Sequence, residues 1–235
     1  MNGARGANAI SVLLADDHAA IRVGMRMVIE TQPGLTVVGE AADGARAVEM
    51  ARALRPDVVL MDLRMPVVDG IRATGQITRA GWSRVLVLTT FDHDDYLFGA
   101  LEAGADGFLL KTAEPAEITS ALQRVHAGDA VISPEVTSRI VGVALAARPG
   151  RAGGTAGGGG TQAATAQAAA DEALGSLTER EREVLGCLGE GLSNHALGRR
   201  LGISETTVKT HVSRVLAKLG LQSRVQAALF AGRLG

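Results

Sequence analysis

The sequence predicts an α/β domain with a doubly wound, five-stranded parallel sheet, followed by a small all-α domain of four helices. Within residues 10–130, five short apolar runs alternate with amphipathic stretches, which is the pattern of repeated βα units. The runs are continuously apolar, as expected for parallel strands whose two faces are both covered by helices. Beyond them, a tract rich in Gly and Ala gives way to a segment divided by helix caps and glycines.

The first domain is predicted to cover residues 9–130. Its expected strands are 10–15, 35–39, 57–61, 84–89 and 106–110, and its expected helices are 18–31, 43–54, 69–79, 93–103 and 114–126. Pro33-Gly34 and Pro56 lie at junctions between these elements, where turns are expected. Ligands of such a sheet bind at the carboxyl ends of the strands. The polar residues that follow each apolar run are therefore the candidates for a functional site.

The rest of the chain divides by composition. Residues 131–175 are interpreted as a helical extension and a flexible Gly/Ala-rich linker, because four glycines, Gly157 to Gly160, lie beside an Ala-, Thr- and Gln-rich stretch. Residues 176–235 are interpreted as the helical domain. Its four helices are expected to begin at a capping box of Thr178 and Glu181, at Ser193, at Ser204 and at Ser223, the last one ending near Gly232.

Charge and composition narrow the functional classes. Residues 1–140 hold 13 Lys+Arg against 18 Asp+Glu, whereas residues 176–235 hold 9 against 5, so the second domain could bind a polyanion. No stretch approaches the length of a membrane span, and the N-terminus does not read as a signal peptide. The single cysteine, Cys187, excludes an internal disulfide and is expected to pack in the core. A cytoplasmic protein without membrane contact is expected.

Four of the apolar runs end in polar groups that could together transfer a phosphoryl group. Asp16-Asp17, Asp62, Thr89 and Lys111 each follow or end one run. Mg²⁺ binds one or two carboxylates together with phosphate oxygens, and an aspartate can accept a phosphoryl group as an acyl phosphate. We therefore expect Asp62 to be the nucleophile. Mg²⁺ and Lys111 would offset charge on the transferred group, and Thr89 would donate to a phosphate oxygen.

Each of these residues also has an ordinary structural interpretation. An Asp after a strand is most often a helix cap or turn residue, a Lys there is most often solvated, and a Thr there most often packs. The five residues occur together, each at a strand end and in this order. That combination favours the functional interpretation.

The same residues resemble a known family. Asp16-Asp17, Asp62 with Met65-Pro66, Thr89, and Gly104 to Phe108 before Lys111 are similar to the receiver domain of bacterial two-component response regulators, a flavodoxin-like fold. The resemblance implies that a sensor histidine kinase phosphorylates Asp62. It implies that Asp17, Asp62 and the backbone carbonyl of Arg64 bind Mg²⁺, with Asp16 acting through water. It also implies that Thr89, Phe108 and Lys111 form the switch; Phe108 replaces the usual Tyr and offers no hydroxyl.

The second domain contains a predicted helix-turn-helix. Val208, Val212 and Val215 share the apolar face of its third helix, and the opposite face would enter the major groove of double-stranded DNA. Lys209 can donate to guanine and Thr210 can contact thymine. The candidate DNA-contacting residues are Ser204, Thr206, Thr207, Lys209, Thr210, Ser213 and Arg214. Charge alone leaves open a merely solvated basic face.

A second resemblance bears on that alternative. Leu177 to Leu185, Gly191 to Asn194, Thr207 to Val212 and Lys218 to Gly220 are similar to the LuxR-type helix-turn-helix, and with the receiver they resemble the NarL/FixJ response regulators. The resemblance implies a transcription regulator that forms a homodimer when phosphorylated. One departure stands out, because the family usually has Glu three residues after Ser193 and this chain has Ala196. The second capping box is then incomplete.

Three alternatives remain at this point. Haloacid-dehalogenase-like phosphatases also use an aspartyl nucleophile, but they require a second Asp two residues later, where this chain has Arg64; we therefore expect no metabolic enzyme. A regulator of the same architecture could bind DNA without phosphorylation. A binding module without a DNA role would show no salt-dependent duplex binding.

Overall fold

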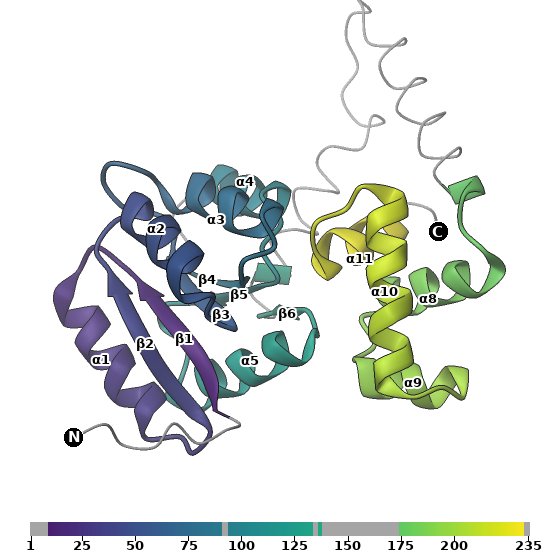
Figure 1. The fold of residues 1–235 in the computed structure, drawn as a ribbon, viewed down its shortest axis with the longest axis horizontal. Coiled ribbons are helices and arrows are strands. Elements are labelled where there is room, and N and C mark those ends of the chain that lie inside the picture. The colour runs from purple at the N-terminus through teal and green to yellow at the C-terminus, as the bar shows by residue number, and fades with distance from the viewer. Residues whose placement is uncertain (1–8, 91–93, 134–135, 138–173, 233–235) are drawn as a thin grey trace, which may run out of the picture.

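The structure is a computed structural model that describes residues 9–90, 94–133, 136–137 and 174–232. The α/β part precedes a helical part, and the two lie side by side (Figure 1). The sheet is entirely parallel, in the order β2-β1-β3-β4-β5-β6. Its strands are β1 Ile10–Ala15, β2 Leu35–Ala41, β3 Val58–Asp62, β4 Arg84–Thr89, β5 Gly107–Leu110 and β6 Val131–Ile132.

The five-strand prediction is wrong by one strand. β6 continues the sheet beyond β5, with Val131 opposite Gly107 and Ile132 opposite Phe108. A two-residue strand has no apolar run of its own, so hydrophobic periodicity cannot reveal it. The parallel α/β architecture itself is confirmed.

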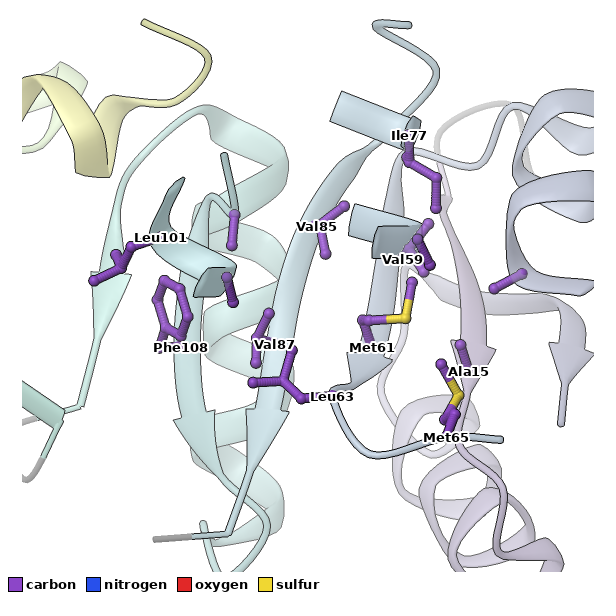
Figure 2. Packing of buried hydrophobic residues seen from close by; sticks show 14 of the residues in the cluster. Ala15, Val59, Met61, Leu63, Met65, Ile77, Val85, Val87, Leu101 and Phe108 are labelled. Atoms are coloured by element: carbon purple, nitrogen blue, oxygen red, sulfur yellow. The ribbon is translucent and has the colours of Figure 1, made fainter. Parts of the chain in front are cut away.

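Helices cover both faces of the sheet (Figure 1). They are α1 Ala19–Glu30, α2 Gly44–Leu54, α3 Gly70–Arg79, α4 Asp94–Glu102 and α5 Pro115–Ala127. Alternate strand residues belong to two cores. Leu13, Met61 and Phe108 pack with α2, α3 and α4, and Figure 2 shows Met61 and Phe108 of this cluster. Val12, Leu60 and Leu109 pack with α1 and α5. Continuous apolar strands therefore mean burial on both sides, as predicted.

The helical part contains α8 Glu179–Gly189, α9 Asn194–Leu201, α10 Glu205–Leu219 and α11 Arg224–Gly232. Thr178, Ser193 and Ser204 cap the first three through their side chains, as predicted. Val208, Val212 and Val215 of α10 lie in the core together with Cys187. Of the predicted helical extension and linker at 131–175, residues 134–135 and 138–173 lie outside the described residues. Within the described part of the chain, no helix combines the length and the apolar character needed to cross a membrane.

The two parts contact each other through α11. Val225 is completely buried in the core that α4 shares with the sheet. The Gln226 side-chain amide donates to the carbonyls of Leu101 at 2.8 Å and Glu102 at 3.1 Å, both in the last turn of α4. These bonds satisfy carbonyl groups that a helix end otherwise leaves unpaired. The helical part therefore rests on α4 by a specific polar contact as well as by apolar packing.

The capping box of α8 gives the helical part a predicted pH dependence. Glu181 accepts from Lys218 Nζ at 2.7 Å and from the Thr178 backbone N–H at 2.8 Å, and these bonds lower the pKa of Glu181 to about 2. A carboxyl whose pKa falls on folding stabilises the fold above its unfolded pKa, and this stabilisation disappears as pH falls toward the folded pKa. We expect Glu181→Gln to lower the melting temperature at neutral pH and to weaken its dependence on pH between about 4.5 and 2.

Thermal melts followed by circular dichroism across that pH range test this expectation. Glu183→Gln is the control, because Glu183 lies on the same helix but is exposed and forms a surface ion pair with Arg180 at 2.7 Å. Equal pH profiles for the two variants would contradict the assignment.

Candidate phosphoacceptor site and DNA-binding surface

Asp62 lies at the carboxyl end of the central strand β3 and is buried, with 5% of its surface exposed. Lys111 follows β5, and its Nζ lies 2.8 Å from Asp62 Oδ2 and 2.7 Å from Asp16 Oδ2. Parallel strands bring their carboxyl ends to one sheet edge. Three of the predicted residues, from β1, β3 and β5, are therefore brought into direct contact.

The buried site shifts the pKa values of both Asp62 and Lys111. Burial raises the pKa of the Asp62 carboxyl, and the bonds from Lys111 and from the Arg64 backbone N–H only partly offset this effect. Burial alone would lower the pKa of Lys111, but its bonds to Asp16 and Asp62 outweigh burial and raise it. Lys111 is therefore held as a cation between two carboxylates. A bound divalent cation would add positive charge where burial disfavours the anion.

The donors around Asp16 fit a hard cation. Carboxylate oxygens of Asp16 and Asp17 and the Nδ1 of His18 lie within 4.8 Å of one another. His18 Nδ1 is 2.6 Å from Asp17 Oδ1, and the His18 backbone N–H donates to Asp16. The two carboxylates of this cluster are of the ligand type that Mg²⁺ binds, whereas the His18 nitrogen is not. The sequence analysis missed His18, although its position directly after the Asp pair could have drawn attention to it.

The other predicted switch residues, Thr89 and Phe108, make contacts away from Asp62. The Thr89 hydroxyl donates to the Thr90 carbonyl at 3.0 Å, and the Arg64 side chain donates to Thr90 Oγ1 at 2.7 Å. Phe108 is completely buried beside Leu101 (Figure 2). In this conformation the Phe108 ring therefore belongs to the hydrophobic core.

The loop after Asp62 contains a strained residue. Val67 has φ 66° and is 85% exposed, and the Val68 N–H donates to the Pro66 carbonyl at 2.8 Å across it. A β-branched residue in the left-handed region costs roughly 1–2 kcal/mol. We expect Val67→Gly to raise the free energy of unfolding by about 1 kcal/mol, measured by denaturant titration. Val23→Gly, at an exposed position within α1, should instead lower it; a loss in both variants would argue against strain at Val67.

The predicted DNA-contacting surface of α10 is open. All seven candidate residues are exposed, namely Ser204, Thr206, Thr207, Lys209, Thr210, Ser213 and Arg214. Ser204 Oγ accepts from the Thr207 backbone N–H at 3.2 Å, and Thr210 Oγ1 donates to the Thr206 carbonyl at 3.1 Å. The Ser204 hydroxyl therefore caps the start of α10, whereas the Thr210 hydroxyl bonds back to a carbonyl one turn earlier within the same helix. Contact with the α/β part does not cover this surface.

Comparisons with known proteins agree with both halves of the fold. Residues 12–123 match the response regulator receiver domain, and residues 175–231 match the bacterial regulatory proteins of the luxR family. The transcriptional regulatory protein LiaR of Bacillus subtilis is 39% identical over 95% of this chain and 97% of its own length. The nitrate/nitrite response regulator NarL of Escherichia coli is 36% identical over 94% of each chain. The crystal structure of ChrA, a response regulator of a heme-sensing two-component system, is 34% identical with a TM-score of 0.52 and covers 97% of this chain and 98% of that one.

A receiver domain joined to a LuxR-type helix-turn-helix defines a response regulator that binds DNA. The chain belongs to the NarL/FixJ family of response regulators. It is a phosphorylation-regulated, DNA-binding transcriptional regulator. The relatives named above are transcriptional response regulators.

Proposed function

We propose that Asp62 is the phosphoacceptor of this regulator and that a sensor histidine kinase is its phosphodonor. An oxygen of Asp62 attacks the phosphorus of the kinase phosphohistidine; the new P–O bond forms as the P–N bond breaks, and the imidazole leaves. One observation carries this proposal: in a buried site, Lys111 Nζ lies 2.8 Å from Asp62 Oδ2 and 2.7 Å from Asp16 Oδ2. A fixed cation beside the accepting oxygen can stabilise charge on the transferred group.

Mg²⁺ would be held by Asp17, Asp62 and the backbone carbonyl of Arg64, with Asp16 acting through a water. When bound, the metal neutralises charge on the phosphoryl oxygens. Asp62 supplies the nucleophilic oxygen, Lys111 keeps that oxygen in place, and burial of Asp62 limits competing water.

The signal would reach DNA through Thr89 and the face that contains α4. Thr89 would leave the Thr90 carbonyl and donate to the phosphoryl group, with Phe108 and Lys111 completing the switch. Because α11 rests on α4, movement at this face would loosen the helical part and allow a homodimer to form on double-stranded DNA. The seven exposed residues of α10 would contact that DNA. In this proposal the receiver domain covers residues 9–130, the extension and linker cover 131–175, and the DNA-binding domain covers 176–235.

The direct test is phosphate uptake. The protein is incubated with Mg²⁺ and a small-molecule phosphodonor, and its intact mass and oligomeric state are recorded beside Asp62→Ala. We expect one added phosphate in the wild type only, together with a shift toward dimer. A folded wild type that takes up no phosphate would instead favour the alternative of phosphorylation-independent DNA binding.

A further inference from the structure

A second polar contact between the two parts occurs at the start of α9. The Asn194 backbone N–H donates to Asp129 Oδ1 at 2.8 Å, and its side-chain amide donates to the Ala127 carbonyl at 2.9 Å. Arg224 Nη1 donates to the Gly128 carbonyl at 3.1 Å and lies 3.7 Å from Asp129 Oδ1. A carboxylate of the receiver is thus bound by a backbone amide and faces a guanidinium of the helical domain.

The start of α9 can bind an anion because its first turn contains no acidic residue of its own. Ser193 Oγ accepts from the Ala196 N–H, but Ala196 cannot complete the capping box, and the first turn of α9 contains no acidic residue. In contrast, α8 completes its box with Glu181. Unpaired N–H groups and the helix dipole make a helix start attractive to anions. Asp129 supplies the negative charge from outside the domain.

Arg224 is the second part of the site. It is 4% exposed, and its Nη1 also donates to Asn194 Oδ1 at 2.5 Å while its Nη2 contacts the Leu192 carbonyl. The guanidinium is therefore held beside the start of α9 by contacts within the helical domain. If the receiver moves away, Arg224 and the Asn194 N–H lose their receiver partners but keep their mutual arrangement.

We propose that Asn194 and Arg224 contact a DNA phosphate and that Asp129 occupies the position of this phosphate when the two domains are in contact. The inference rests on the proposed function, because it requires α10 to be the recognition helix. The first helix of a helix-turn-helix crosses the DNA backbone, and helix N-termini, backbone amides and arginines are common phosphate donors. Carboxylate and phosphate would then compete for the same donors, which couples domain contact to DNA binding.

A simple interdomain latch makes a different prediction. Breaking a latch from either side should release the helical domain and raise DNA affinity. A shared phosphate site predicts opposite changes in DNA affinity. Removing Asp129 frees the donors and raises the affinity, whereas removing Arg224 deletes a donor that DNA needs and lowers the affinity. The sign of the Arg224 effect therefore separates the two accounts.

The experiment measures binding of the unphosphorylated full chain to a labelled mixed-sequence duplex, because the phosphate contribution is independent of sequence. We expect Asp129→Asn to bind about tenfold more tightly than the wild type, as for loss of one competing charge-assisted hydrogen bond. Asp129→Asn combined with Arg224→Gln should bind more weakly than Asp129→Asn alone, with a salt slope reduced by about one. Glu117→Gln removes the same charge from an exposed side chain in the first turn of α5, at the opposite end of that helix from Asp129, and should leave affinity unchanged.

The outcomes are separable. Equal affinity of Asp129→Asn with and without Arg224→Gln would overturn the phosphate site and leave a latch. If a melt shows the Arg224→Gln chain unfolded, Arg224→Lys takes its place, since it retains the charge but loses the paired donors; undiminished binding would again overturn the inference. Lys209→Ala, in the exposed face of α10, tests the underlying function: if it does not weaken duplex binding, the proposed DNA surface itself is wrong.

Discussion

Replacing Gly70 with alanine is expected to lower the free energy of unfolding of the receiver domain by about 3 kcal/mol. A Cβ on Gly70 would lie 2.0 Å from the Asp62 carbonyl oxygen and 2.7 Å from the Leu63 Cα. Both neighbours are backbone atoms at the end of β3, beside the proposed phosphoacceptor Asp62, so no side-chain rotation relieves the clash. Denaturant titration measures the loss, and phosphate uptake at Asp62 should slow because that strand end must shift.

Gly24→Ala is the matched control. A Cβ on Gly24, within α1, meets nothing within 4 Å. Alanine there should raise stability by up to about 1 kcal/mol, because glycine is the poorer helix former. If Gly70→Ala proved as stable as Gly24→Ala, the close approach of Gly70 to Asp62 would be refuted.

Replacing Lys111 with methionine is expected to cost about 3 kcal/mol at neutral pH without divalent metal. The substitution leaves Asp16 and Asp62, 6% and 5% exposed, without the ammonium group that bonds both of them. Breaking a buried ion pair strands its remaining charges, which is why the loss is large. Added Mg²⁺ should restore part of the stability in Lys111→Met, and more than it adds to the wild type. Thermal melts with and without Mg²⁺ measure both effects.

Lys209→Met serves as the control for this second prediction. Lys209 is exposed on α10, so the same change of side chain should leave unfolding nearly unaffected. An Mg²⁺ response in Lys111→Met no larger than in Lys209→Met would mean that the Asp16–Asp62 edge does not hold the cation.

Local sequence patterns were sufficient to predict most of the helices and strands of the fold. The strands with apolar runs and the helices with caps were predictable because periodicity and capping act over a few residues. β6 was not, since Val131 and Ile132 become a strand only by pairing with Gly107 and Phe108. The contact of Asn194 with Asp129 joins residues 65 apart in the chain and has no local signature.

The candidate site also has one part that could be predicted from the sequence and one part that could not. Asp16, Asp62 and Lys111 could be predicted to meet because strand topology fixes which chain segments share the sheet edge. The hydrogen bond of Thr89 to Thr90 and the burial of Phe108 depend on the conformational state of the domain. Composition and spacing do not encode which state is populated.

The central claim is that phosphorylation at Asp62 controls DNA binding. The most direct measurement is the affinity of one protein preparation for duplex DNA with and without a phosphodonor, in the presence of Mg²⁺, with Asp62→Ala measured in parallel. We predict a gain of about tenfold in the phosphorylated wild type, within the usual range of coupling between two sites, and no change in Asp62→Ala. Phosphate uptake by the wild type without any change in affinity, or an equal gain in Asp62→Ala, would contradict the account.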